Sequence, residues 1–142
     1  MNSFTLIEKA LLLKSTHLFK ELDLDLLLII SEKLGSIRCE NKQKIFSIGQ
    51  EANRMFLISQ GTIAIKTPKK EHYILSKGEF FGDESLFNQG PRTYEATSLT
   101  QTNLLTLSRT NLLAVIAECP SVAINLLEVY TKHIVFRNRS LD

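Results

Sequence analysis

All six glycines of this 142-residue chain lie in its middle, and residues 1–34 and 91–142 contain none. Glycine marks places where the backbone turns sharply or where another group approaches it closely. The distribution therefore predicts a middle part with many sharp turns between two end segments without them. It constrains the fold more than the ordinary bulk composition does. The glycines are Gly35, Gly49, Gly61, Gly78, Gly82 and Gly90.

Two helices are predicted before residue 36. Thr5 and Glu8 have the spacing of a capping box, in which a hydroxyl and a carboxylate three residues later each accept a backbone amide proton. The apolar residues that follow keep helical spacing. A second helix is expected over residues 24–34, with Asp23 as its N-cap and Gly35 as the left-handed residue that ends it.

From residue 36 the pattern changes to short runs rich in β-branched and aromatic residues, separated by turn signals. Strands this short and this closely spaced leave no room for helical crossovers, so they are expected to be antiparallel. Such a set is typical of a roll or sandwich. The predicted strands contain Ile45–Phe46, Met55–Ile58, Thr62–Lys66, His72–Leu75, Tyr94–Thr97 and Leu104–Leu107.

After residue 108 the helical period returns. Pro120 interrupts it, and because proline at the first position of a helix costs no hydrogen bond, a further helix is expected to begin there and run toward Arg137. The predicted fold class is α+β and mainly β, in one domain. N-terminal helices (1–35) precede an antiparallel β-roll or jelly roll (36–108), and two C-terminal helices (109–142) follow it.

The segment 80–94 does not fit an ordinary strand connection, because its middle, from Asp83 to Asn88, predicts a single helical turn. Gly82 lets the backbone come close to a ligand, and the free amides at a helix start favour an anion. Arg92 can fold back over the same place, where its guanidinium would clamp a phosphate. Asp83 accepts hydrogen bonds only, which suits a sugar hydroxyl.

This segment resembles the phosphate-binding cassette of the cyclic nucleotide-binding domain family. The family pattern is Phe-Gly-Glu-x-(Ala/Ser/Gly)-Leu, a loop, and then (Pro)-Arg-(Ala/Ser/Thr)-Ala. The hairpin over residues 46–61, the helical entry over 5–19 and the closing helices over 112–135 are also similar to the family, of its bacterial, stand-alone type. The cassette match consists of Phe81-Gly82-Asp83-Glu84-Ser85-Leu86 and Pro91-Arg92-Thr93.

The resemblance implies a site for the cyclic phosphate. Arg92 would pair with the phosphate, and the backbone amides around Glu84 and Ser85 would donate to it. The hydroxyls of Ser85 and Thr93 would complete this phosphate-binding set.

The resemblance also implies contacts to the ribose and the base. Gly82 and Asp83 would contact the ribose 2′-hydroxyl. Tyr94 and Thr93 are the candidate base contacts. Tyr94 stands where the family has a small alanine and can stack on a base or crowd the pocket, and Thr93 is the residue type of members that accept cGMP.

The expected function is that of a regulatory module that binds cAMP or cGMP and signals through movement of residues 111–139. No catalysis, cofactor or metal is expected. The expected partner is a protein target or a second copy, engaged through the C-terminal helices. No DNA contact is expected, because the given chain ends at Asp142 without a helix-turn-helix.

A cytoplasmic location without membrane insertion is also expected. The longest apolar run, from Leu26 to Ile30, is far shorter than the roughly 20 residues of a membrane span. No basic leader precedes the first apolar stretch, so a secretory signal is not expected. Cys39 and Cys119 do not make a disulfide framework.

Other function classes have less support in the sequence. A metal-dependent enzyme of the cupin kind needs converging histidines, and only His72 lies among the predicted strands. The Gly-x-Ser-x-Gly elbow of a hydrolase is absent. The main alternative is a degenerate domain that has lost its nucleotide and acts as a protein-interaction module. Asp83, one methylene shorter than the family's glutamate, and Tyr94 favour that alternative. Arg92 favours binding, because an arginine in an empty phosphate cradle is expected to have no structural purpose.

Overall fold

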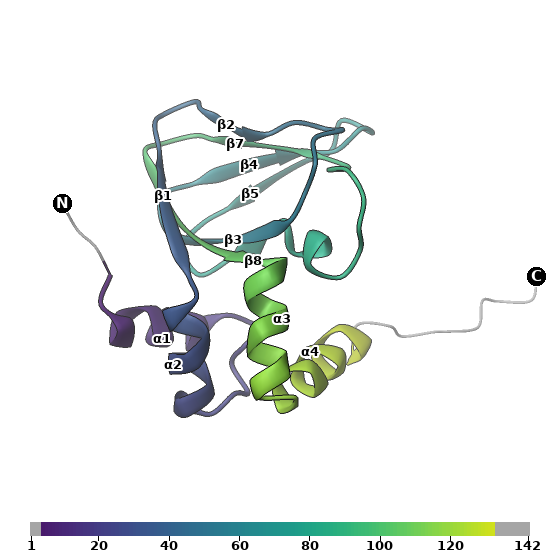
Figure 1. Cartoon of the computed structure of the whole chain (residues 1–142). Helices are drawn as coiled ribbons and strands as arrows, with labels where there is room; N and C mark the ends of the chain where they lie inside the picture. The colour runs from purple at the N-terminus through teal and green to yellow at the C-terminus, as the bar shows by residue number, and fades with distance from the viewer. Residues whose placement is uncertain (1–3, 133–142) are drawn as a thin grey trace, which may run out of the picture.

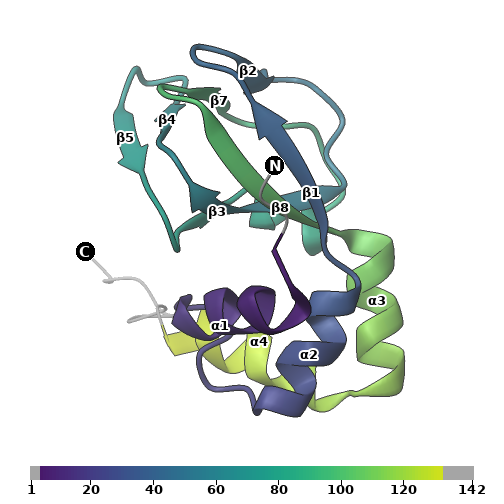
Figure 2. The same cartoon turned by 90° about the vertical axis from the view of Figure 1, so that its left-hand side faces the viewer.

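The computed structural model describes residues 4–132, in which a β-roll lies on a layer of four helices (Figure 1). Turning the molecule by 90° shows the same division, with all four helices on one side of the roll (Figure 2). The elements in chain order are α1 (Leu6–Ser15), α2 (Leu24–Glu32), β1 (Gly35–Cys39), β2 (Lys44–Phe46), β3 (Arg54–Gln60), β4 (Ile63–Lys66), β5 (His72–Leu75), β6 (Phe80–Phe81), the 3-10 helix η1 (Asp83–Leu86), β7 (Glu95–Ser98), β8 (Thr102–Ser108), α3 (Arg109–Glu118) and α4 (Ser121–Lys132).

The strands form two four-stranded sheets. One has the order β1-β8-β3-β6 and the other the order β2-β7-β4-β5, and every pairing within them is antiparallel. The predicted class, α+β with a mainly antiparallel β-roll between N-terminal and C-terminal helices, is confirmed. All six predicted strands form. The pattern did not single out β1 and β6 as strands.

In the sheet of β1, β8, β3 and β6, the central strands β3 and β8 are buried on both faces, which explains the continuous apolar run in β3. Met55 and Leu57 pack in a cluster with the helices, whereas Phe56 and Ile58 pack in a second cluster between the two sheets. Because successive side chains of a strand point to opposite faces, one strand supplies both cores. The cassette segment (80–94) begins with β6, and pairing of β6 with the buried strand β3 holds this end of the cassette in place.

The predicted start of the first helix is confirmed, and the predicted end of the second is wrong. The Thr5 amide donates to Glu8 Oε1 at 2.9 Å and the Glu8 amide donates to Thr5 Oγ1 at 3.1 Å, which completes the capping box. Asp23 is the N-cap of α2 but makes no side-chain cap bond. Gly35 is not left-handed; it begins β1 and pairs with Thr106. A Cβ on Gly35 would lie 2.8 Å from Thr106 Oγ1, so close strand packing explains this glycine.

The C-terminal helices are found where the sequence predicts them. Pro120 directly precedes α4, and the extension of that helix toward Arg137 falls outside the described residues. Within residues 4–132 no single helix is long and apolar enough to cross a membrane. Taken together, α3 and α4 reach that length and composition, but with a bend of 118° between them.

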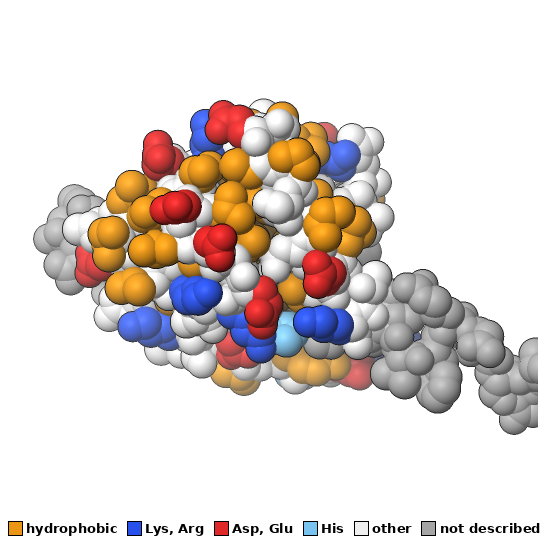
Figure 3. Space-filling view, turned by 90° about the horizontal axis from the view of Figure 1, so that it is seen from below, with side chains coloured by type: hydrophobic (Ala, Val, Ile, Leu, Met, Phe, Trp, Pro, Cys, Tyr) orange, Lys and Arg blue, Asp and Glu red, His pale blue; other side chains and the backbone are white. Residues whose placement is uncertain are grey.

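The outer face of the helical layer carries exposed hydrophobic side chains. Seen from below, these gather over the helices with charged side chains between them (Figure 3). The exposed set includes Leu11 of α1, Leu24 of α2, Leu113 of α3, and Ile124 and Leu127 of α4.

Candidate functional site

The cassette begins with a left-handed glycine between β6 and η1. Gly82 has φ +76°, and a Cβ there would lie 2.9 Å from Arg92 Nη1 and 3.2 Å from the Phe56 ring. A side chain at this position would be strained by the backbone conformation and would also push the guanidinium away. The backbone at Gly82 is thus closely approached by the chain's own arginine, and the approach of a ligand there stays a prediction.

Arg92 lies beneath the cassette with only 6% of its surface exposed. Its Nη1 donates to the Gly82 carbonyl at 3.1 Å and its Nη2 donates to the Arg54 carbonyl at 2.7 Å. The guanidinium carbon stacks over the Phe46 ring, 4.1 Å from its centroid. The prediction that this arginine has no structural purpose is thus wrong, because it joins the cassette to β2 and β3.

Arg92 nevertheless has no carboxylate in salt-bridge contact within residues 4–132, although Glu84 and Asp83 are close enough to favour its charged form. Its Nε has no hydrogen-bond partner among the described residues. Burial lowers the pKa of the guanidinium, which remains a cation because the pKa of an arginine starts far above neutral pH. A buried cation bonded only to carbonyl oxygens is suited to an anion that could approach it.

Ser85 converges on the same two carbonyl groups as Arg92. Its Oγ lies 2.8 Å from the Gly82 oxygen and 2.9 Å from the Arg54 oxygen, and the residue is buried. Its backbone amide also donates to the Gly82 carbonyl, at 3.3 Å. The structure therefore brings the predicted hydroxyl and the predicted guanidinium together, with the hydroxyl proton directed at backbone carbonyls.

The side chain of Tyr94 reaches back to the start of the cassette and bonds to Gly82 and Glu84 there. Its hydroxyl accepts the Gly82 amide proton at 2.7 Å and lies 3.1 Å from both carboxylate oxygens of Glu84, to which it donates. Its ring packs on Phe46, with centroids 5.4 Å apart. Burial and the nearby Glu84 carboxylate raise the pKa of Tyr94, so the phenol keeps its proton at neutral pH.

Asp83 is bonded to the C-terminal helix. The hydroxyl of Tyr130, on α4, donates to Asp83 Oδ2 at 2.6 Å, and the Tyr130 ring meets Phe87 edge-on with centroids 5.3 Å apart. Burial and the Asp83 carboxylate raise the pKa of Tyr130, which keeps this donor protonated. Each acidic side chain at the cassette start thus accepts a hydrogen bond from a phenol, Glu84 from Tyr94 at the end of the cassette and Asp83 from Tyr130 on α4.

The charge of Glu84 is disfavoured in this setting. Although the Glu84 side chain is exposed at the surface, partial loss of hydration next to the protein and, second, the charge of Asp83 raise the pKa of its carboxyl group.

Thr93, the second predicted phosphate-binding hydroxyl, is exposed. Of the predicted site residues, the structure gathers Gly82, Asp83, Glu84, Ser85, Arg92 and Tyr94 in one cluster.

Three contributors to this cluster were not found from the sequence. Phe46 lies under the guanidinium, and Arg54 contributes a backbone carbonyl, which no residue type signals. Tyr130 lies on α4, within the helix predicted to follow Pro120. Its contact with Asp83 spans 47 positions of the chain and carries no sequence signal.

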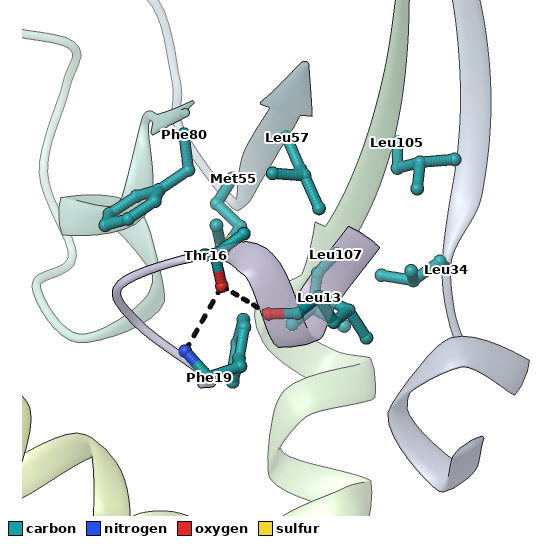
Figure 4. A pocket seen from close by; sticks show the side chains of 9 residues that line it. All are labelled: Leu13, Thr16, Phe19, Leu34, Met55, Leu57, Phe80, Leu105 and Leu107. Carbon is teal, nitrogen blue, oxygen red and sulfur yellow. Dashed lines mark hydrogen bonds between the residues drawn. The ribbon is translucent and has the colours of Figure 1, made fainter. Parts of the chain in front are cut away.

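An open groove runs beside Arg92 and Phe46. Its lining includes Gln50, Glu51, Asn53, Arg54 and Ser108. A second feature is a closed gap of about 10 Å³ between the helices and β3 and β8, with a lining that is apolar apart from one threonine (Figure 4). There the Thr16 hydroxyl donates to the Leu13 carbonyl and accepts from the Phe19 amide, so its bonding is internal. A gap barely the size of one water is a packing void and holds no ligand.

Across residues 4–132 no group of three or more histidine, cysteine, aspartate or glutamate side chains is arranged to hold a metal ion. The site cluster consists of a guanidinium, hydroxyls, two carboxylates and backbone amides. This set can bind an anion next to a hydroxyl-bearing group.

The family model of the cyclic nucleotide-binding domain matches residues 37–119. The chain is 24% identical over 135 residues to a CRP-like cAMP-activated global transcriptional regulator of Mycobacterium tuberculosis, covering 92% of this chain and 60% of the relative. It is 29% identical over 103 residues to a cyclic AMP receptor protein of Thermus thermophilus, covering 69% of this chain and 48% of that one. The chain thus spans between about half and three fifths of these curated relatives.

Solved structures share the fold. The N-terminal domain of a transcriptional regulator from Streptomyces coelicolor superposes with a TM-score of 0.78 at 25% identity, covering 87% of this chain and 91% of that one. The catabolite activator protein of Thermus thermophilus superposes with a TM-score of 0.74 at 26% identity, covering 84% of this chain and 58% of that one. The names of these relatives describe regulators, and a further relative is a cyclic nucleotide-gated potassium channel of Mesorhizobium japonicum.

Proposed function

The chain belongs to the cyclic nucleotide-binding domain family, and from that premise we propose that it is a regulatory module that binds a 3′,5′-cyclic nucleotide at its cassette. The observation that carries this proposal is Arg92, a buried guanidinium with an unpartnered Nε and no carboxylate against it among the described residues. No catalytic step, cofactor or metal is part of the proposal.

The phosphate is proposed to bind at Arg92. A cyclic phosphodiester carries a single negative charge, and a fork of N–H donors matches two of its oxygens. The guanidinium would turn from the Gly82 and Arg54 carbonyls toward the ligand, and the hydroxyl of Ser85 can rotate with it. The amide of Glu84 and the exposed hydroxyl of Thr93 remain the predicted additional donors.

The nucleotide proposed first is cAMP. Two relatives carry cAMP in their names, which supports this choice. Thr93 is the sequence feature that favours cGMP, so both nucleotides belong in the test. The ribose is proposed to lie at Gly82 and Asp83, and the base beside Tyr94.

The signal is proposed to pass through α4. Asp83, the predicted ribose contact, already accepts a hydrogen bond from Tyr130 of that helix at 2.6 Å, and Phe87 packs on the same tyrosine. A ribose hydroxyl that displaces Tyr130 from Asp83 would favour a state in which α4 has left the cassette. The partner that senses this state is proposed to be a protein or a second copy that meets the C-terminal helices, where Leu113, Ile124 and Leu127 are exposed.

Calorimetric titration of the wild type, Arg92→Glu and Arg38→Glu with cAMP and with cGMP tests the binding proposal. Arg38 is largely exposed and pairs only loosely with Glu40, at 3.8 Å, so its reversal matches the charge change away from the cassette. We expect binding by the wild type and by Arg38→Glu, and none by Arg92→Glu. Binding that survives in a folded Arg92→Glu protein contradicts the cassette assignment. The absence of binding in the wild type would instead indicate the interaction-module alternative.

Hydrogen exchange tests the signalling route. Saturating nucleotide is expected to change exchange across residues 111–139, with faster exchange in α4 where the Tyr130 contact is lost. Unchanged exchange in a protein that calorimetry shows to be saturated would refute the route while leaving the binding proposal intact.

A further inference from the structure

The hydroxyl of Tyr94 already takes the Gly82 amide, which is the backbone contact predicted for the ribose hydroxyl at the cassette start. It accepts the Gly82 amide proton at 2.7 Å and donates to the Glu84 carboxylate at 3.1 Å. A ribose 2′-hydroxyl is also a single donor and acceptor, and Gly82 is the predicted backbone contact for it. A backbone amide has one proton, so Tyr94 and a nucleotide cannot both have this bond at full strength.

We propose that Tyr94 is an internal occupant of the ribose position, so that it limits nucleotide affinity and removes most of the advantage of a 2′-hydroxyl. This inference rests on the proposed function, because it concerns the same site. It adds a specificity-determining residue and predicts an unusual tolerance for 2′-deoxy nucleotides.

Burial and charge keep the tyrosine in this position. The raised pKa of Tyr94 maintains it as a neutral donor to Glu84. Its ring packs 5.4 Å from Phe46, and that same ring supports the Arg92 guanidinium at 4.1 Å. Displacing the Tyr94 ring would therefore disturb Phe46, which supports Arg92, the residue proposed to bind the phosphate. Ribose binding and phosphate binding would then be coupled through Phe46.

Competition of this kind lowers apparent affinity by the fraction of molecules in which the position is free. A ribose hydroxyl that takes the Gly82 amide replaces the equivalent bond to Tyr94, so its net contribution in the wild type is small. A 2′-deoxy nucleotide leaves Tyr94 in place. In Tyr94→Phe the Gly82 amide is free, and the 2′-hydroxyl should then contribute about tenfold in affinity, the upper end for a neutral hydrogen bond.

The experiment is calorimetry on the wild type, Tyr94→Phe and Tyr94→Ala with cAMP, cGMP and the 2′-deoxy analogue of each. Tyr94→Phe retains the ring that packs on Phe46 and removes only the hydroxyl. Tyr94→Ala restores the small residue of the family pattern and also removes the ring. Thermal unfolding of all three proteins establishes that each is folded.

We expect the wild type to bind a nucleotide and its deoxy analogue within about twofold, and Tyr94→Phe to prefer the ribonucleotide by about tenfold. Binding by Tyr94→Phe where the wild type shows none would support the same inference in a stronger form. An equal preference in the wild type and Tyr94→Phe overturns it and leaves the proposed function standing. Absence of binding in all three folded proteins overturns the proposed function and this inference together.

Discussion

Three glycine-to-alanine substitutions separate backbone strain from crowding at the cassette. Gly82 has both, with φ +76° and a Cβ position 2.9 Å from Arg92 Nη1 and 3.3 Å from the Arg54 carbonyl oxygen. Gly49 has strain alone, with φ +91° and nothing within 4 Å of its Cβ position. Gly90 has neither, since its Cβ position is also open and its φ lies outside the left-handed region.

The magnitudes follow from those environments. An alanine in the left-handed conformation lowers the free energy of unfolding by about 1–2 kcal/mol. The smaller conformational freedom of the unfolded chain raises it again by about 0.4–1 kcal/mol. Gly49→Ala should therefore lower the free energy of unfolding by about 1 kcal/mol. Crowding adds about 1–3 kcal/mol at Gly82, for a total loss of about 3 kcal/mol and a fall in Tm of about 10 °C. Gly90→Ala should stay within about 0.5 kcal/mol of the wild type.

Urea denaturation followed by far-ultraviolet circular dichroism measures all three variants against the wild type. Calorimetry with cAMP then tests function, because only Gly82→Ala displaces the guanidinium and should lose nucleotide affinity. A Gly82→Ala protein that is no less stable than Gly49→Ala would refute the close contact with Arg92. A loss of affinity in Gly49→Ala as large as in Gly82→Ala would refute the assignment of the effect to crowding at Gly82.

Three further substitutions test individual contacts. Tyr130→Phe removes the bond to Asp83 and should lower the free energy of unfolding by about 1–3 kcal/mol and speed hydrogen exchange in α4; unchanged exchange there would contradict the contact. Arg92→Lys retains the charge but not the two-pronged bonding, so calorimetry should show cAMP affinity at least about tenfold weaker, and full affinity would argue against a guanidinium-specific site. The raised pKa of Glu84 means that the folded state binds its proton more tightly than the unfolded chain, for which the reference pKa is 4.5. The unfolding free energy of the wild type minus that of Glu84→Gln should therefore fall as pH rises from 4.5 through the higher folded pKa, and urea titrations that show this difference rising with pH would contradict the shift.

Local chemistry explains the parts of the fold that could be predicted. The Thr5 and Glu8 capping box, the short β-rich runs and the helical turn after Gly82 depend on neighbours within a few residues, so their residue types are sufficient signals. The cassette motif belongs to this class, because the turn and the arginine that returns to it lie within fifteen residues of sequence (80–94).

Gly35 shows where local signals fail. Its position after an apolar helix is typical of a left-handed stop, yet a contact with Thr106, far away in the sequence, decides its role. The strand β6 was missed for a related reason. Two residues carry no period, and only pairing with β3 makes them a strand.

The residues proposed for the site, Gly82, Asp83, Ser85 and Arg92, could be predicted from the sequence by itself, because the cassette is a short contiguous motif. The partners of these residues were decided by the tertiary structure alone. Tyr94 reaches back to the Gly82 amide because its ring packs on Phe46 inside the roll, and Tyr130 meets Asp83 because α4 packs near the cassette. Hydrogen bonds act over about 3 Å, whatever the separation along the chain, so the state of the site depends on the folded molecule and not on the motif.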